Sequence, residues 1–224
     1  MTALILMRLS GFIRTGRFIP PLIAALVLLG VLYGGGQAGI AEAYGVSALL
    51  MFPILAWQTK LLLDTEPDVQ RKMALVALRS RVREAVGGMT AAAIVAVPVV
   101  LIAMVLPWIV EGLKPVDVGN GLLLGLWAHL IVVPPALALG GLSSRVIAGT
   151  AGRAAAILTG GLILALVLGL RSSPVPWLAP PLISAAHTLA QGASAAPLVG
   201  LTAWALVWAT VVLAGYGWLR RARS

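Results

Sequence analysis

Long apolar stretches alternate with short polar ones along this chain, and their lengths match the thickness of a lipid bilayer. A helix rises about 1.5 Å per residue and the hydrocarbon core is about 30 Å thick, so a span needs about 20 apolar residues. No alternating pattern typical of a barrel is present, so the spans are expected to be helices. The pattern predicts six of them, at residues 19–37, 44–63, 89–109, 120–142, 154–170 and 197–219.

Composition supports the same interpretation. Of the 224 residues, 60% are hydrophobic and 10% are charged, whereas soluble domains carry about a quarter charged residues. Too little polar surface remains to cover a water-soluble globule. We therefore predict an all-α polytopic membrane protein, with residues 1–224 forming a single transmembrane domain. The chain has no cysteine, which excludes disulfides, thiolate metal sites and a cysteine nucleophile.

The basic residues predict the orientation. All 16 lysines and arginines except Lys114 and Arg171 precede the first span, lie at or after the end of the second, join the fourth and fifth, or end the chain. Cytoplasmic loops are enriched in these residues, so both chain ends and these loops are expected on the cytoplasmic side of the cell membrane. The net charge of +9 thus indicates topology, with no nucleic-acid partner expected.

Residues 1–17 have the spacing of an amphipathic helix lying in the cytoplasmic interface. The alternative is a frayed basic leader. The apolar arc of the predicted helix contains Ile5, Leu6, Leu9, Phe12 and Ile13, and the remaining face contains Arg8, Ser10, Arg14, Thr15 and Arg17.

The cytoplasmic loop 64–88 predicts a short helix from about Asp68 to Leu78. Asp64, Thr65 and Glu66 offer capping oxygens, and Pro67 suits the first helical position. Asp68 and Lys72 have the spacing of an ion pair. Ser80 is placed to cap the helix that becomes the third span. The apolar face that this helix would carry contains Val69, Met73, Val76 and Ala77. A merely solvated connector does not need such a face, so a docking helix is favoured.

The external segment 171–196 is apolar but interrupted by four prolines. Apolar segments of this length that do not span are often re-entrant or interfacial. We expect one or two short helices in the outer leaflet, with Trp177 near the headgroups. A disordered external loop is the weaker alternative.

A histidine, a proline and a glycine pair inside the fourth span have structural or functional interpretations. His129 and Pro134 in the fourth span are candidates for the substrate path, although a buried histidine is also commonly a packing residue bonded to a neighbouring helix. Gly121 and Gly125 form one of three small-xxx-small pairs, which permit close helix approach within a subunit or between subunits.

The sequence offers few motifs for catalysis. The chain has no G-x-x-x-x-G-K-[ST] phosphate loop, and His129 and His187 do not have metal-ligand spacing. The run Gly141–Ser144 resembles the G-x-S-G motif of intramembrane serine proteases, but the second glycine is missing and the last span has no histidine. We therefore expect no catalytic, metal or cofactor site in the chain itself.

The order of parts resembles the membrane subunit of a type-2 ABC exporter. The shared order is an amphipathic N-terminal helix, two spans, a basic loop with a short helix, three spans, a broken apolar segment and a last span. The best local match is Ala77–Gly88, ALRSRVREAVGG, where a Ser-Arg pair is followed by an acid and then glycine. The proline usual before the serine is absent, and the acid comes one position late.

This resemblance implies a half-transporter that exports a hydrophobic or amphipathic cargo, such as a drug, a peptide or a lipid-like molecule. Two copies of a separate ATPase subunit would hold ATP and Mg²⁺, and a second membrane subunit, identical or homologous, would complete the substrate path within the lipid bilayer. The bracing N-terminal helix would use Arg8, Phe12, Arg14 and Arg17. The ATPase-coupling residues would be Asp68, Val69, Arg71, Lys72, Met73, Val76, Arg79, Arg81 and Glu84.

A membrane scaffold or assembly protein, which binds a partner but moves nothing, is the alternative from a different class. It predicts no ATP-dependent transport in vesicles even when the partner is present.

Overall fold

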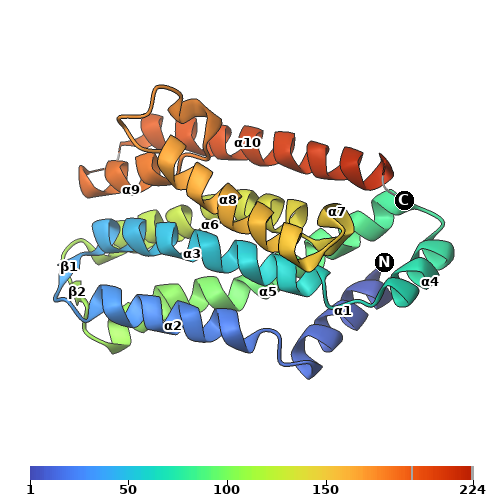
Figure 1. The fold of residues 1–224 in the computed structure, drawn as a ribbon. Helices are drawn as coiled ribbons and strands as arrows, with labels where there is room; N and C mark the ends of the chain where they lie inside the picture. Colours follow the sequence, from blue (N-terminus) through green and yellow to red (C-terminus); the bar gives the residue numbers. More distant parts are fainter. Residues whose placement is uncertain (193, 223–224) are drawn as a thin grey trace.

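The computed structural model describes residues 1–192 and 194–222, and these ranges form a bundle of helices with almost no strand (Figure 1). The all-α prediction is confirmed. The helices are α1 (Thr2–Arg14), α2 (Ile19–Tyr33), α3 (Ile40–Leu63), α4 (Asp68–Leu78), α5 (Arg81–Ile109), α6 (Val118–Leu142), α7 (Arg145–Ala148), α8 (Ala151–Leu168), η1 (Pro176–Leu178, a 3₁₀ turn), α9 (Leu182–Ala190) and α10 (Ala195–Ala222). The strands β1 (Ala38–Gly39) and β2 (Leu113–Lys114) pair in parallel.

Within the described ranges, five helices are long and apolar enough to cross a membrane: α3, α5, α6, α8 and α10. The number becomes six if α1 and α2, which meet at a bend of 70°, are taken together as one broken span. The predicted first span, 19–37, is shorter as a helix, because α2 has 15 residues and ends at Tyr33, before three consecutive glycines. At 1.5 Å per residue it is about 22 Å long.

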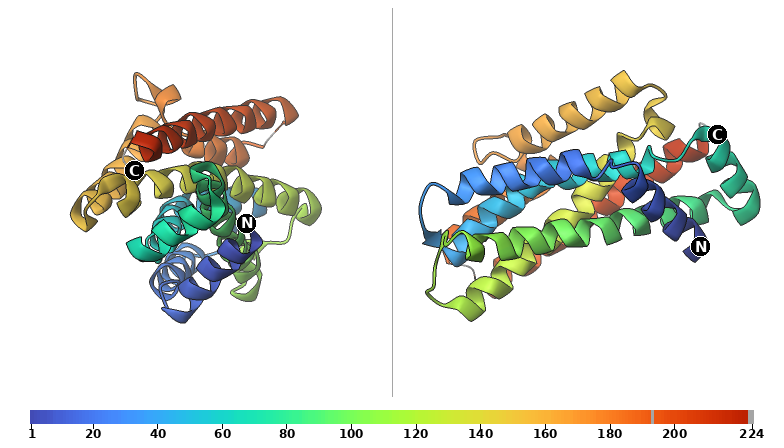
Figure 2. Two further views of the ribbon diagram at one scale, coloured as in Figure 1. Left: turned by 90° about the vertical axis from the view of Figure 1, so that its right-hand side faces the viewer. Right: turned by 90° about the horizontal axis from the view of Figure 1, so that it is seen from below.

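The two ends of the bundle hold different parts of the chain (Figures 1 and 2). Both chain ends lie at one end, together with α1, α4 and α7, whereas β1 and β2 lie at the other. We call the first the basic end; Arg8, Arg81, Arg145 and Arg220 lie there. Lys114, one of the two basic residues predicted to lie on the opposite side, is in β2. The uneven distribution of charge that the sequence predicts is therefore a property of the fold.

The centre of the bundle is the pair α3 and α6. In each, 61% of the apolar window, an 18-residue apolar stretch of the helix, is buried within the chain. Glycines permit this packing, because a Cβ on Gly125 would overlap the Tyr44 ring and one on Gly140 would lie 2.5 Å from the carbonyl oxygen of Ala56. Gly121 similarly faces Ile40. The Gly121–Gly125 pair thus serves a helix contact inside the chain.

Residues 171–196, predicted to hold one or two short helices, contain η1 and α9. Leu182, Ala185 and Leu189 of α9 are buried, and the helix packs against α3, where Gly45 faces the backbone of Ala186. Two tryptophans of α10 attach the η1 turn. The indole N–H of Trp208 donates to the Leu178 carbonyl at 2.7 Å, and that of Trp204 donates to the Ala179 carbonyl at 3.0 Å.

Candidate functional site

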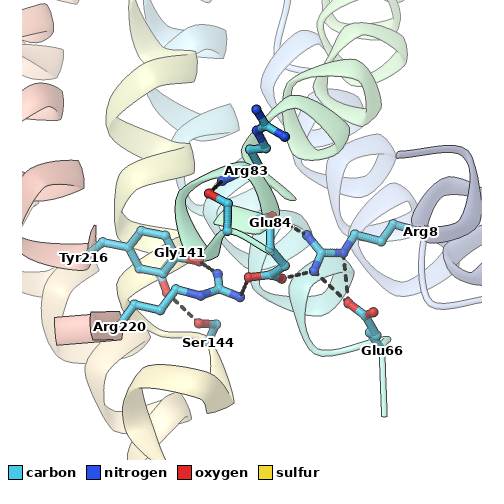
Figure 3. Close-up of polar contacts among 9 residues, drawn as sticks. Arg8, Glu66, Arg83, Glu84, Gly141, Ser144, Tyr216 and Arg220 are labelled. Carbon is cyan, nitrogen blue, oxygen red and sulfur yellow. Dashed lines mark hydrogen bonds and ion pairs between the residues drawn. The ribbon is translucent and has the colours of Figure 1, made fainter. Parts of the chain in front are cut away.

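The basic end contains a buried network of four charged side chains: Arg8, Glu66, Glu84 and Arg220 (Figure 3). They come from α1, from the connection between α3 and α4, from the first turn of α5 and from the last turn of α10. We call this set the ion network. It joins parts of the chain that are far apart in sequence at one point of the fold.

Arg8 forms one half of the ion network. Its Nε and Nη2 atoms donate to Oε2 of Glu66 at 3.0 and 2.7 Å. Nη2 also donates to Oε1 of Glu84, and Nη1 donates to the Glu84 main-chain carbonyl at 3.2 Å. Gly88 makes room for this guanidinium, since a Cβ there would overlap Nη1. Arg8 therefore holds α1 against both the loop before α4 and the start of α5.

Arg220 forms the other half. Its Nη2 donates to Oε2 of Glu84, and its Nη1 donates to the hydroxyl of Tyr216, one turn earlier on α10. The two carboxylate oxygens of Glu84 are thus divided between two arginines. Through this one side chain, α5 is connected to both α1 and α10 (Figure 3).

The ion network is balanced in charge, with two arginines and two glutamates, and its side chains are almost wholly buried. Burial lowers the pKa of the Arg8 guanidinium, but Glu84 and Glu66 outweigh that effect, so the pKa is raised above its ordinary value. A buried charge that loses its partner costs about 3–5 kcal/mol. Removal of one member of the network is therefore expected to destabilise the joined helix ends.

A second polar cluster surrounds Asp64, two residues before Glu66. Lys60 Nζ donates to Asp64 Oδ2 at 2.9 Å, and the main-chain N–H of Arg145 donates to Oδ1 at 2.7 Å. The guanidinium groups of Arg17 and Arg145 donate to the Asp64 carbonyl at 2.6 and 3.0 Å. The short segment 64–66 is therefore fixed to the linker after α1, to α3, to α7 and, through Glu66, to α1.

Helix α4 begins and ends where the sequence predicts. Pro67, expected at the first helical position, instead lies one residue before it in extended conformation, and no side chain in the described part of the chain caps the start of α4. Arg79 ends the helix in the left-handed region at φ 50°, a conformation uncommon for a residue other than glycine. The Ser80 hydroxyl then accepts from the N–H of Arg83 at 3.3 Å and caps α5. The predicted cap is confirmed.

The apolar face of α4 is exposed. Val69, Met73 and Val76, at positions i, i+4 and i+7, are 65%, 67% and 78% exposed. Together with Ala77 they line a shallow groove. A helix with an uncovered apolar face at this spacing is typical of one that docks into a partner. We call Val69, Met73 and Val76 the α4 face.

The other predicted coupling residues lie in different surroundings. Arg79, Arg81 and Arg83 are exposed and Arg71 is half-buried, all at the basic end. The side chains of Asp68 and Lys72 lie outside the described part, so their predicted ion pair stays a prediction. Glu84 is fully buried in the ion network, where no partner subunit could contact it.

The predicted N-terminal helix is present as α1, but its faces differ from the prediction. Of the apolar arc, Phe12 is buried in the fold, whereas Leu6 and Ile13 are about 60% exposed and remain available to the membrane interface in which the prediction places them. Arg8, assigned to the polar face, is 4% exposed, because the carboxylates of Glu66 and Glu84 solvate it inside the fold. Arg14 is exposed, and Arg17 binds the Asp64 carbonyl.

His129 is enclosed between α3 and α6. Its Nε2 lies 3.0 Å from the Ser47 hydroxyl, and its Nδ1 lies 2.8 Å from the Gly125 carbonyl. Both ring nitrogens have partners inside the chain and the side chain is 1% exposed, which agrees with the packing interpretation. Pro134, by contrast, lines an apolar groove between α6 and α10.

The serine run at the end of α6 gives the protease alternative no support. Ser143 and Ser144 are fully buried. Their hydroxyls donate to the carbonyls of Gly140 and Gly141 at 3.0 and 2.7 Å, so they close the end of their own helix. Among the described residues, no group of three or more histidine and carboxylate side chains could hold a metal ion.

The sequence suggested Asp64 and Glu66 only as capping oxygens for α4, which is wrong because no side chain among the described residues caps that helix, and it gave Arg220 no role beyond topology. One signal was available: Asp64, Glu66 and Glu84 are three of only seven acidic residues, and all lie in the loop 64–88, which has more lysines and arginines than any other loop. Acids within a basic segment are candidates for buried pairing.

Comparison of the chain with protein-family models, with curated proteins and with solved structures gives no match. The function of the chain is therefore inferred from the geometry of the basic end.

Proposed function

We propose that this chain is the membrane-spanning subunit of an ATP-driven exporter and that the α4 face is where a separate ATPase subunit docks. The observation that carries the proposal is the exposed apolar α4 face on a helix whose start is fixed to the bundle. In this proposal the basic end faces the cytoplasm, in keeping with its arginines.

The attachment of α4 supports a role in transmitting motion. On its N-terminal side, segment 64–66 is bonded to Arg8, Arg17 and Arg145. On its C-terminal side, Arg79 and Ser80 lead directly into α5. A displacement of α4 by a partner would therefore act on the ends of several helices at once. Coupling between sites requires such a physical connection.

The external energy source follows from the chain's own chemistry. The sequence contains no phosphate loop, so ATP hydrolysis by that route must come from a partner. Within the chain, 17% of the apolar window of α8 and 11% of that of α10 are buried. The rest of their surface is left for lipid and for a second membrane subunit.

The test is association with an ATPase. The full chain is purified with a partner that contains a Walker motif, and ATP hydrolysis by the complex is measured in nanodiscs. Changing Val69, Met73 and Val76 together to aspartate is expected to abolish association and the associated hydrolysis, because it places charges on an apolar interface. The matched control is Val116→Asp, at a residue 75% exposed before α6 at the opposite end of the bundle, which is expected to retain both.

Association that survives the triple change would overturn the assignment of the α4 face. A partner that binds through the α4 face but supports no ATP-dependent transport in vesicles would favour the scaffold function.

A further inference from the structure

A second feature of the basic end is a groove between α5 and α10, about 320 Å³ in volume. The two helices are joined there by the Glu84–Arg220 pair but leave an open channel along their sides. The apolar floor is formed by Val82, Ala85, Val86, Met89 and Leu213. Val82 and Val86 are each about half exposed, at 51% and 49%.

The rim of this groove is basic. Arg81, Arg220 and Arg221 line its end, at the first residue of α5 and in the last turn of α10. Arg81 reaches across the groove, with Nη1 donating to the Arg221 carbonyl at 3.3 Å. Arg220 is paired with Glu84 in the ion network, so the mouth presents the guanidinium groups of Arg81 and Arg221 above an apolar floor.

The depth of the rim matches that of lipid headgroups. Helix α5 has 29 residues and α10 has 28, so each is about 42–44 Å long. The hydrocarbon core is about 30 Å thick, and the bilayer with its headgroups is about 40–45 Å. With α5 and α10 centred in a bilayer, about 6–7 Å of each helix end would lie outside the hydrocarbon core, which places the arginines and Val82 at headgroup depth and Val86 and Met89 at acyl-chain depth.

We propose that this groove binds a phospholipid with an anionic headgroup, with one acyl chain along Val86 and Met89 and the phosphate between Arg81 and Arg221. Basic pockets between membrane helices at the cytoplasmic side recognise such headgroups. The neighbouring groove between α6 and α10, about 380 Å³, has no charged residue among its described lining. It offers an acyl chain the same apolar contact but no charge complementarity.

The lipid site is independent of the ATPase proposal, since it requires neither the α4 face nor a partner. Its test uses the purified full chain in detergent micelles and native mass spectrometry. Phosphatidylglycerol and phosphatidylcholine with identical acyl chains are titrated separately, so that only the headgroup differs.

The unaltered chain is expected to bind phosphatidylglycerol more tightly than phosphatidylcholine. Each arginine near a headgroup contributes about fivefold in affinity, so the double variant Arg81→Gln, Arg221→Gln is expected to lose roughly 25-fold for phosphatidylglycerol. Phosphatidylcholine binding is expected to change little. The matched control is Arg153→Gln, an exposed arginine on α8 at the same end and outside the groove, which is expected to change affinity by less than twofold.

Photolabelling of the unaltered chain is a second test of the site. Phosphatidylglycerol with a photoactivatable acyl chain is expected to label α5 and α10 at residues 86–89 and 213–217. Labelling spread evenly over the bundle, or an equal loss of affinity in the double variant and in Arg153→Gln, would overturn the site. So would efficient disulfide formation between two copies of a Val86→Cys variant in membranes, because a second copy would then fill the groove; the chain has no other cysteine.

Discussion

The central helices α3 and α6 and the peripheral helices α8 and α10 are all strongly apolar but differ in what covers them. In the central pair 61% of the apolar window is buried within the chain, against 17% for α8 and 11% for α10. The central pair is held by close packing at glycines, whereas α10 is held at its end by one ion pair and along its length mostly by α6. Hydropathy alone identifies spanning helices, but it does not distinguish a helix buried within the chain from one that the chain leaves uncovered.

The largest effect is expected at the ion pair that holds the end of α10. Glu84→Gln leaves Arg8 and Arg220 without their shared carboxylate and is expected to reduce the free energy of unfolding by about 3–5 kcal/mol. The measurement is thermal unfolding in detergent, followed by the fluorescence of the seven tryptophans. Glu111→Gln, at an exposed acid of the opposite end, is the control and is expected to be neutral. Equal stability of the two variants would show that the ion network does not hold α10.

A smaller loss is expected in the central pair. Gly125→Ala places a methyl group against the Tyr44 ring and is expected to cost about 1–3 kcal/mol, since the close-packed helices must separate. Gly160→Ala in α8 is the matched control, because a Cβ there has open space and alanine favours the helix. The same unfolding measurement compares them. If Gly160→Ala costs as much as Gly125→Ala, α8 must be covered by something outside the chain.

The smallest effect concerns the polar contact inside the central pair. Ser47→Ala removes the hydroxyl that bonds His129 Nε2 and is expected to cost about 1 kcal/mol, the usual scale for a hydrogen bond between membrane helices. Thr210→Ala, on the exposed side of α10 and bonded to a carbonyl of its own helix, should change the unfolding midpoint far less. A midpoint unchanged by Ser47→Ala would mean that packing alone holds α3 and α6 together.

Much of the fold could be predicted because it depends on local patterns. The apolar stretches locate the spanning helices, and the pattern Pro67, Asp68 and Ser80 locates the start of α4 and the cap of α5. The predicted length of α2 was wrong. Hydropathy extends the first span to residue 37, but the helix ends at Tyr33, before Gly34 to Gly36.

The ion network could not be predicted from such patterns. Arg8 lies 58 residues from Glu66 and 76 from Glu84 in the sequence, and no local spacing connects them. An arginine on a helical wheel is assigned to the polar, solvent-exposed face. Arg8 is buried instead, because two other parts of the chain supply the carboxylates that pair with it. The exposed α4 face, in contrast, was visible in the sequence as an i, i+4, i+7 pattern.

The ion network also sets an order of events during synthesis. Glu84 is made 136 residues before Arg220, so for most of translation its carboxylate has Arg8 but not its second arginine. Only when the last turn of α10 has been made are both Glu84 oxygens bonded, and a chain that stops earlier leaves one of them unpaired at the bundle end. Helix α10 thus completes the charge balance of the helices made before it, because until it is made one arginine, Arg8, faces the two buried carboxylates of Glu66 and Glu84.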